Sequence, residues 1–251
     1  MIFNVDETAC FNNTDSVKIR VVTTEKIKNP IRKIPKSRFH ITAVCTIADD
    51  GTYLPTLILD KRKTVERNFV DNFSTVPLSF VFSESGYMNQ NLFHLFITSI
   101  LLPNIRQRRK KIGKNAKALL ILDNAPSHYN SESIKICKKN LIQILFLPSN
   151  STDFLQPLDV GCFKGFKSYI KRQLIDGTYE SFLSTIRDGL QVSLTFKNIR
   201  NSFKTCGITP YETLVELPNN TPIAKPKKNK KNELDYHLVD KLLHQKIFYR
   251  Y

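Results

Sequence analysis

Short apolar runs separated by polar turns predict strands at the start of the chain. Residues 2–5 form one such run, which leads directly to Asp6, and two further runs cover residues 40–48 and 52–59. The segment between these two runs, residues 49–51, reads Asp-Asp-Gly, which is a turn signal between β-branched stretches. We therefore expect a three-stranded antiparallel unit here.

A helix is expected over residues 89–102, after a less regular stretch that contains Pro77. Apolar side chains recur in it at three- and four-residue steps, which is the spacing of one helix face. Asn89 is the expected N-cap, and Pro103 is the expected stop.

Two more strands are expected further along the chain. Residues 117–122 and 142–147 are apolar runs of strand length, and a helical pattern over residues 131–139 lies between them. The resulting order, β-β-β-α-β-α-β-α, predicts an α/β fold with a five-stranded sheet flanked by helices.

The last helix of this series, residues 158–174, carries a buried stripe and a basic stripe. The buried stripe consists of Phe163, Phe166, Ile170 and Leu174, and the basic stripe of Lys164, Lys167 and Lys171. Asp159 lies four residues before Phe163, so it should point toward the sheet from the first turn, where the helix dipole favours a carboxylate.

The remaining chain predicts a sequence of domains and appendages. We expect a catalytic domain over residues 1–175 and a helical extension over residues 176–216. A basic linker rich in Pro, Lys and Asn should follow over residues 217–232, and a short C-terminal helix over residues 233–251.

Charge narrows the class of partner. The 251 residues include 38 Lys and Arg against 22 Asp and Glu, a formal net charge of +16, and their hydrophobic content of 41% is enough for a core. Such an excess favours a polyanionic partner, with nucleic acid as the leading candidate and no small-molecule substrate expected. The alternative interpretation of the charge is solubility or nonspecific binding.

Cysteine usage and hydropathy narrow the location. The five cysteines contain no Cys-x-x-Cys pair, so neither a disulfide framework nor a zinc site is expected. We therefore expect a reducing, intracellular compartment. No signal-peptide pattern is visible, and the longest apolar stretch, around residues 92–102, is too short to span a bilayer. The lysine-rich residues 225–231 resemble a nuclear localisation signal. We expect a nuclear protein without membrane insertion.

Three carboxylates stand at the edges of these expected elements. Asp6 follows the first strand, Asp123 closes the strand over residues 117–122, and Asp159 opens the last helix. Carboxylate oxygens are the ligands that hard divalent cations require for phosphoryl transfer. Each aspartate alone is equally typical of a cap or a turn, but the combination in this order favours a metal site.

Three sequence blocks carry a resemblance. The segments NVDET (residues 4–8), LLILDNAPSH (119–128) and LPSNSTDFLQPLDVG (147–161) resemble the catalytic blocks of the pogo/Tigger/jerky group of DDE transposases, relatives of the mariner group and of centromere protein B. The similarity extends to SGYMNQNLFHLFI (85–97) and FKTCGITP (203–210), so it covers most of the first 212 residues.

The resemblance implies an RNase H-like fold with a mixed sheet, and DNA strand cleavage and joining by transesterification. The three aspartates of the family fall on Asp6, Asp123 and Asp159, and they would bind two Mg²⁺ or Mn²⁺ ions. Two such ions lie roughly 3.5–4 Å apart and clamp the attacking and leaving oxygens. We expect Asp6 to bridge both ions, with Asp123 on one and Asp159 on the other, and a homo-oligomer on DNA is a further possibility.

Other residues are expected to assist. Asn124 could orient Asp123, and His128 could support its loop or touch substrate. Glu7 should turn to the face opposite Asp6, which favours a supporting or surface role. Expected DNA contacts are the basic stripe Lys164, Lys167 and Lys171 and the run Arg106, Arg108, Arg109, Lys110 and Lys111, for which simple solvation is the alternative.

Two functional hypotheses follow. The first is a divalent-metal-dependent DNA endonuclease or transposase. The second is a domesticated, non-catalytic DNA- or chromatin-binding protein derived from a pogo/Tigger transposase. Full-length relatives carry an N-terminal helix-turn-helix region, whereas five residues precede Asp6, so the sequence leaves recognition of transposon ends open.

Overall fold

The computed structural model describes residues 1–11, 39–62, 77–173 and 178–208. The chain divides into two units, Met1–Glu216 and Leu217–Tyr251, and every described residue belongs to the first. The expected linker, with its lysine cluster, and the expected C-terminal helix lie outside the described residues.

A six-stranded sheet with the order β4-β3-β2-β1-β5-β6 forms the centre of the first unit. β1 runs antiparallel to β2 and parallel to β5, so the sheet is mixed, as expected. The strands are β1 (Ile2–Phe11), β2 (His40–Ala48), β3 (Thr56–Asp60), β4 (Leu78–Phe82), β5 (Ala118–Leu122) and β6 (Ile142–Phe146).

The expectation of five strands was wrong by one, because β4 adds a sixth. β4 pairs parallel with β3, and the pairing begins where Thr56 lies opposite Leu78. At this end the Thr56 N–H also donates a hydrogen bond to the Pro77 carbonyl. Its residues are half-buried or exposed, as befits an edge strand, and they follow the irregular stretch that gave no strand signal.

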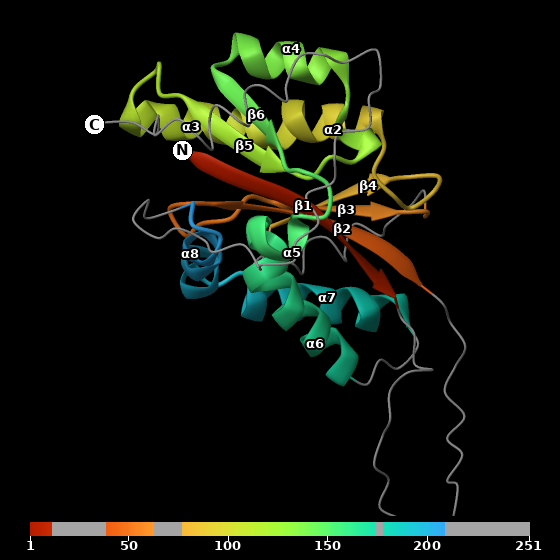
Figure 1. Cartoon of the computed structure of the whole chain (residues 1–251). Helices are drawn as coiled ribbons and strands as arrows, with labels where there is room; N and C mark the ends of the chain where they lie inside the picture. The colour runs from red at the N-terminus through yellow and green to blue at the C-terminus, as the bar shows by residue number, and fades with distance from the viewer. Residues whose placement is uncertain (12–38, 63–76, 174–177, 209–251) are drawn as a thin grey trace, which may run out of the picture. The chain divides into compact units, whose positions relative to one another are not determined.

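Helices cover both faces of the sheet, which explains why the central strands are apolar on both sides (Figure 1). One face packs Phe3 and Val5 of β1 against helices that precede and follow β5. These helices are α2 (Gln90–Phe96), the π-helix η2 (Ile97–Leu101), α3 (Leu102–Ile112) and α4 (Ser131–Lys139).

The opposite face packs Ile2, Cys10 and Cys45 against the C-terminal helices, in a separate apolar cluster. The predicted helix over residues 158–174 begins as a π-helix, and the segment after it forms two helices. The elements on this side are α5 (Thr152–Leu155), η4 (Leu158–Phe163), α6 (Lys164–Arg172), α7 (Tyr179–Ser193) and α8 (Phe196–Thr205). Among the described helices, none combines the length and the apolar character needed to cross a membrane.

The helix capped by Asn89 does not stop at Pro103, contrary to the expectation. Asn89 does cap α2, accepting a hydrogen bond from the Leu92 N–H, but the chain continues through η2 into α3 as far as Ile112. A proline is tolerated within the first turn of a helix, and the wider π-turn just before it accommodates the missing donor.

Candidate active site

The sheet register brings Asp6 and Asp123 to neighbouring positions. β1 and β5 run parallel, with Asn4 opposite Ile121. Two residues further along both segments lie Asp6, on β1, and Asp123, which directly follows the end of β5. Asp6 and Asp123 are therefore neighbours at the carboxyl end of β5.

Asp159 reaches the same place from the helical layer. It lies in the first turn of η4, where Leu158 and Phe163 are buried against the sheet. Its carboxyl group is hydrogen-bonded to that of Asp6. The helical phase thus directs Asp159 to the sheet, and the contact joins a residue of β1 to one 153 positions later in the chain.

Negative charge is crowded around Asp6, which is only 8% exposed. Burial raises the pKa of Asp6 well above its usual value, and the charges of Asp159, Glu7 and Asp123 raise it further, against a lowering hydrogen bond from the Glu7 N–H. Burial also raises the pKa of Asp159, although Lys167 and the bond to Asp6 oppose that shift. This concentration of acidic groups favours the binding of a cation, because three ionised carboxylates would otherwise repel one another.

The donor set is chemically suited to a hard divalent cation, because it consists of carboxylate oxygens. Across the ranges that the structure describes, no three His, Cys, Asp or Glu side chains are already grouped as a metal site. The carboxylate of Asp123 is engaged elsewhere, with His128.

His128 links Asp123 to Glu7. Its Nδ1 lies 2.9 Å from Asp123 Oδ1 and its Nε2 lies 3.0 Å from Glu7 Oε1, and the side chain is 1% exposed. Burial alone would lower the pKa of His128, but the hydrogen bonds and charges of both carboxylates raise it to about 10. The pKa of Asp123 is lowered in return, despite its partial burial. Glu7 lies on the face away from Asp6, where its carboxylate holds this histidine.

Comparison with protein-family models shows which family the chain belongs to. The model of the DDE superfamily endonuclease family matches residues 38–206, more than half of the sequence. The chain belongs to this family. Asp123 and Asp159 lie inside the matched residues, and Asp6 precedes them.

Three curated relatives are similar to parts of the chain, and two of them are a Tigger and a jerky protein. The chain is 36% identical over 116 residues to the "MFS-type transporter clz9" of Cochliobolus lunatus, covering 43% of this chain and 12% of the relative. It is 27% identical over 136 residues to Tigger transposable element-derived protein 7 of Homo sapiens, covering 53% and 24%. It is 28% identical over 93 residues to the Jerky protein of Mus musculus, covering 36% and 16%. The chain thus spans less than a quarter of the length of these relatives.

The fold of this DDE-family domain is that of the mariner transposases. The Mos1 mariner paired end complex with Mn matches with a TM-score of 0.54 and 14% identity, over 82% of this chain and 52% of that one. The Mos1 strand transfer complex matches with a TM-score of 0.53 and 15% identity, over 82% and 51%. These similarities confirm the RNase H-like fold.

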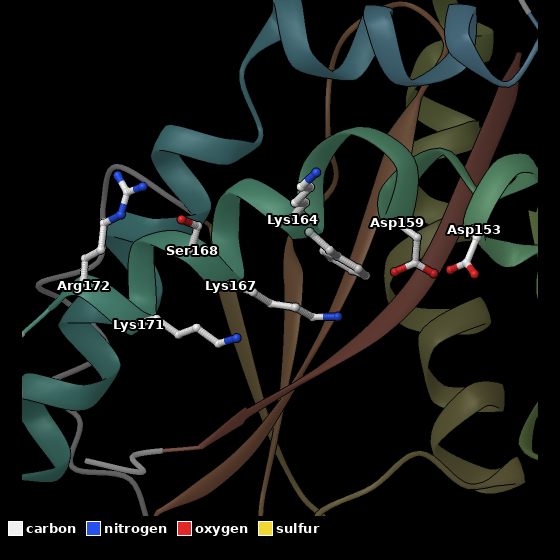
Figure 2. A pocket seen from close by; sticks show the side chains of 8 residues that line it. Asp153, Asp159, Lys164, Lys167, Ser168, Lys171 and Arg172 are labelled. Atoms are coloured by element: carbon white, nitrogen blue, oxygen red, sulfur yellow. The ribbon is translucent and has the colours of Figure 1, made fainter. Parts of the chain in front are cut away.

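A basic groove leads away from Asp159 along α6. It has a volume of about 510 Å³, with Asp153 and Asp159 at one end and a row of cations along its length, as Figure 2 shows. The cations are Lys164, Lys167, Lys171 and Arg172. Lys167 lowers the pKa of Asp159, so its ammonium group is close enough to act on the carboxylate.

The other basic run, on α3, lies elsewhere. α3 ends just before the start of β5, whereas Asp123 follows the end of that strand, roughly 17 Å away at the usual rise of a strand residue. Arg108 is paired with Asp50 and Thr52. Arg109 is 9% exposed and donates to the Ala116 and Asn140 carbonyls, at 2.9 and 2.6 Å, so its guanidinium stabilises the fold. Arg106, Lys110 and Lys111 are exposed on the same helix.

Two buried amides near the aspartates were missed from the sequence. Asn4 and Gln156, both 0% exposed, hydrogen-bond each other at 3.0 Å between Asn4 Nδ2 and Gln156 Oε1. Both lie inside the sequence blocks that carry the aspartates, and that membership was the only signal available. Asn124, in contrast, accepts a hydrogen bond from the Tyr129 hydroxyl, and Tyr129 stacks on Phe146 at 4.6 Å.

Proposed function

We propose that this DDE-family domain cleaves DNA strands with divalent metal ions held by Asp6, Asp123 and Asp159. The observation that supports the proposal is the meeting of Asp6 and Asp159 at the end of the sheet where Asp123 follows β5. Burial, reinforced by neighbouring carboxylates, raises the pKa of Asp6, and burial also raises the pKa of Asp159; shifted carboxyl groups of this kind are typical of functional sites.

Asp6, Asp123 and Asp159 would hold Mg²⁺ or Mn²⁺ ions, because their carboxylate oxygens fit the donor chemistry of hard divalent cations. Such ions lower the pKa of bound water and stabilise the charge that develops on a phosphodiester. Structures of the Mos1 paired end complex, which shares the fold, have been solved with Mn and with Mg. In this chain, a carboxylate of Asp123 held by His128 stays ionised and oriented for a ligand role.

The substrate in this proposal is DNA, bound along the α6 groove. Lys164, Lys167 and Lys171 recur on one face of the helix and would contact successive phosphates of a strand that ends at Asp159. In cleavage, a water oxygen attacks phosphorus as the bond to the opposite oxygen breaks. In strand joining, a DNA 3′-hydroxyl takes the place of the water. Because the substrate is DNA, we also propose that the protein is nuclear.

The proposal is tested by nicking of supercoiled plasmid in the presence of Mn²⁺. Wild-type protein should nick the plasmid, and Asp123→Asn should lose at least about a hundredfold in rate, because metal ligation by that carboxylate is removed. Equal nicking by both proteins would refute the assignment.

A second function, DNA or chromatin binding without cleavage, is favoured by one observation. The Asp123 carboxylate faces His128, and among the residues the structure describes the three aspartates are not grouped as a metal site. This domesticated protein would bind duplex DNA with an affinity that falls steeply with salt, and would leave plasmid intact at every Mn²⁺ concentration.

A further inference from the structure

We infer that Asn4 and Gln156 are positioning residues that fix the spacing between the three aspartates. The inference rests on the proposed function for its catalytic meaning, but its structural content is independent. It assigns to two neutral amides the task of locking together β1, β5 and η4, the elements that carry or directly precede Asp6, Asp123 and Asp159.

Asn4 contacts each of the other two segments. Its Nδ2 donates to the Ile121 carbonyl of β5 at 3.1 Å, two residues before Asp123. Its Oδ1 accepts from the Leu158 N–H of η4 at 3.0 Å, one residue before Asp159. Asn4 itself lies two residues before Asp6, so this one side chain is bonded close to all three carboxylates.

Gln156 completes the arrangement from the helical side. Its Oε1 accepts from Asn4, and its Nε2 donates at 3.2 Å to the carbonyl of Val5, the residue before Asp6. The two amides therefore tie β1 to the segment that leads into η4 through two separate hydrogen bonds.

The partners fix the orientation of the Asn4 amide. The Ile121 carbonyl can only accept and the Leu158 N–H can only donate, so the nitrogen must face β5 and the oxygen must face η4. Burial of these amides is tolerated because their polar atoms are bonded, and a rotated or displaced side chain would leave buried groups unpaired.

The bond to Leu158 also determines where η4 begins. The first N–H groups of a helix have no partner inside it, and Pro157 at the N-cap position makes no side-chain capping bond. Asn4 supplies the acceptor from across the fold. The first turn of η4, and with it Asp159, is thereby anchored to the strand that carries Asp6.

The inference is tested with Gln156→Met and Asn4→Leu. Gln156→Met keeps the length of the side chain and removes both of its hydrogen bonds. Asn4→Leu keeps the size of the side chain, adds no charge to the acidic cluster and removes the bonds to Ile121, Gln156 and Leu158, and it serves as the second variant if the first fails to fold. Arg109→Met is the matched control, because it removes two buried hydrogen bonds to carbonyls at the other end of β5.

Two measurements separate positioning from general stability. Mn²⁺ affinity, measured calorimetrically on the DNA-free protein, should fall roughly 10- to 100-fold in both amide variants and stay unchanged in Arg109→Met. Amide hydrogen exchange of Leu158–Phe163 should become at least about tenfold faster in the amide variants only.

Wild-type Mn²⁺ affinity and wild-type exchange in both amide variants would overturn the inference. If the wild-type protein itself binds no Mn²⁺ and nicks no plasmid, the proposed function fails, and exchange in Leu158–Phe163 still decides whether the amides hold η4 to the strands.

Discussion

The imidazole of His128 lies 2.9 Å, measured from Nδ1, from the Oδ1 of Asp123. Its other nitrogen is held by Glu7, so a buried histidine connects the acidic end of β5 to β1. Two carboxylates keep this histidine protonated, and its charge in turn keeps Asp123 ionised. Orientation of a ligand by a bonded partner of this kind typically contributes 10- to 100-fold to metal affinity or activity.

We therefore expect His128→Gln to lower Mn²⁺ affinity and cleavage rate by about 10- to 100-fold, because glutamine cannot bridge two carboxylates as a cation. The measurements are calorimetric Mn²⁺ binding and plasmid nicking. His94→Gln is the control, since the hydrogen bond of the His94 ring is to Ser133 of α4, and its variant should behave as wild type. Unchanged Mn²⁺ affinity in His128→Gln would remove the role given to this contact.

Two chemically identical substitutions should have opposite effects on the stability of the metal-free protein. Asp6→Asn removes a buried charge that Asp159, Glu7 and Asp123 repel, so it should raise the free energy of unfolding by on the order of 1 kcal/mol. Asp123→Asn removes the partner of a buried histidine, so it should lower that energy by a similar amount.

Urea denaturation in EDTA measures both values. Stabilisation by Asp123→Asn, or destabilisation by Asp6→Asn, would contradict the electrostatics described for the site.

Lys167→Gln should weaken DNA binding and reduce the slope of log affinity against log salt by about one, because one phosphate contact is lost. Lys110→Gln removes the same charge from α3, at the other end of the sheet, and should have little effect. Fluorescence anisotropy with a labelled duplex at several salt concentrations gives both slopes. Equal losses in the two variants would indicate that binding follows net charge and not the α6 groove.

Gly161→Ala should destabilise the domain and disturb η4. An added methyl group would lie 2.8 Å from Ser202 Cβ on α8, closer than such atoms approach, and 3.1 Å from its Cα, which is a tight contact. We expect a loss of about 1–3 kcal/mol in the free energy of unfolding. Adding Ser202→Gly should recover part of that loss, as a double-mutant cycle by urea denaturation would show. A purely additive cycle would mean that the two helices do not meet there.

Stability should fall at alkaline pH through the buried thiols. Burial raises the pKa of Cys10, Cys137 and Cys206 to about 12, whereas an unfolded thiol has a pKa of about 8.5. The contribution of these thiols to the free energy of unfolding is complete below the pKa of the unfolded thiol. It is lost as the pH rises toward the pKa of the folded thiol, since only the unfolded chain then releases protons. Ellman's reagent at pH 8 should accordingly label these cysteines in urea and leave them unlabelled in the native protein.

Sequence reasoning succeeded where the signals are local. The apolar run before Asp123 and the spacing of Phe163 and Phe166 after Asp159 follow directly from the periods of strand and helix, and they were enough to place Asp123 at a strand end and to turn Asp159 toward the sheet. The family resemblance rests on the same blocks, and the family comparison confirms it.

Sequence reasoning failed where the interacting residues are distant in the chain or where the local pattern is weak. The hydrogen bond between Asn4 and Gln156 joins residues 152 positions apart, and nothing in the local sequence indicates that either amide is buried. Arg109 sits in a run of exposed cations, yet tertiary contacts bury it. β4 is a half-buried edge strand without a clear alternation, so only its pairing with β3 reveals it.

The most direct measurement of the central claim is the rate of duplex cleavage as a function of Mn²⁺ concentration, at protein concentrations that saturate the DNA. The comparison sets wild type against Asp6→Asn, Asp123→Asn and Asp159→Asn. If the three aspartates act as one metal site, wild-type cleavage requires Mn²⁺ and each variant loses at least about a hundredfold at every Mn²⁺ concentration. Wild-type rates in any one variant, or cleavage independent of Mn²⁺, would contradict the claim.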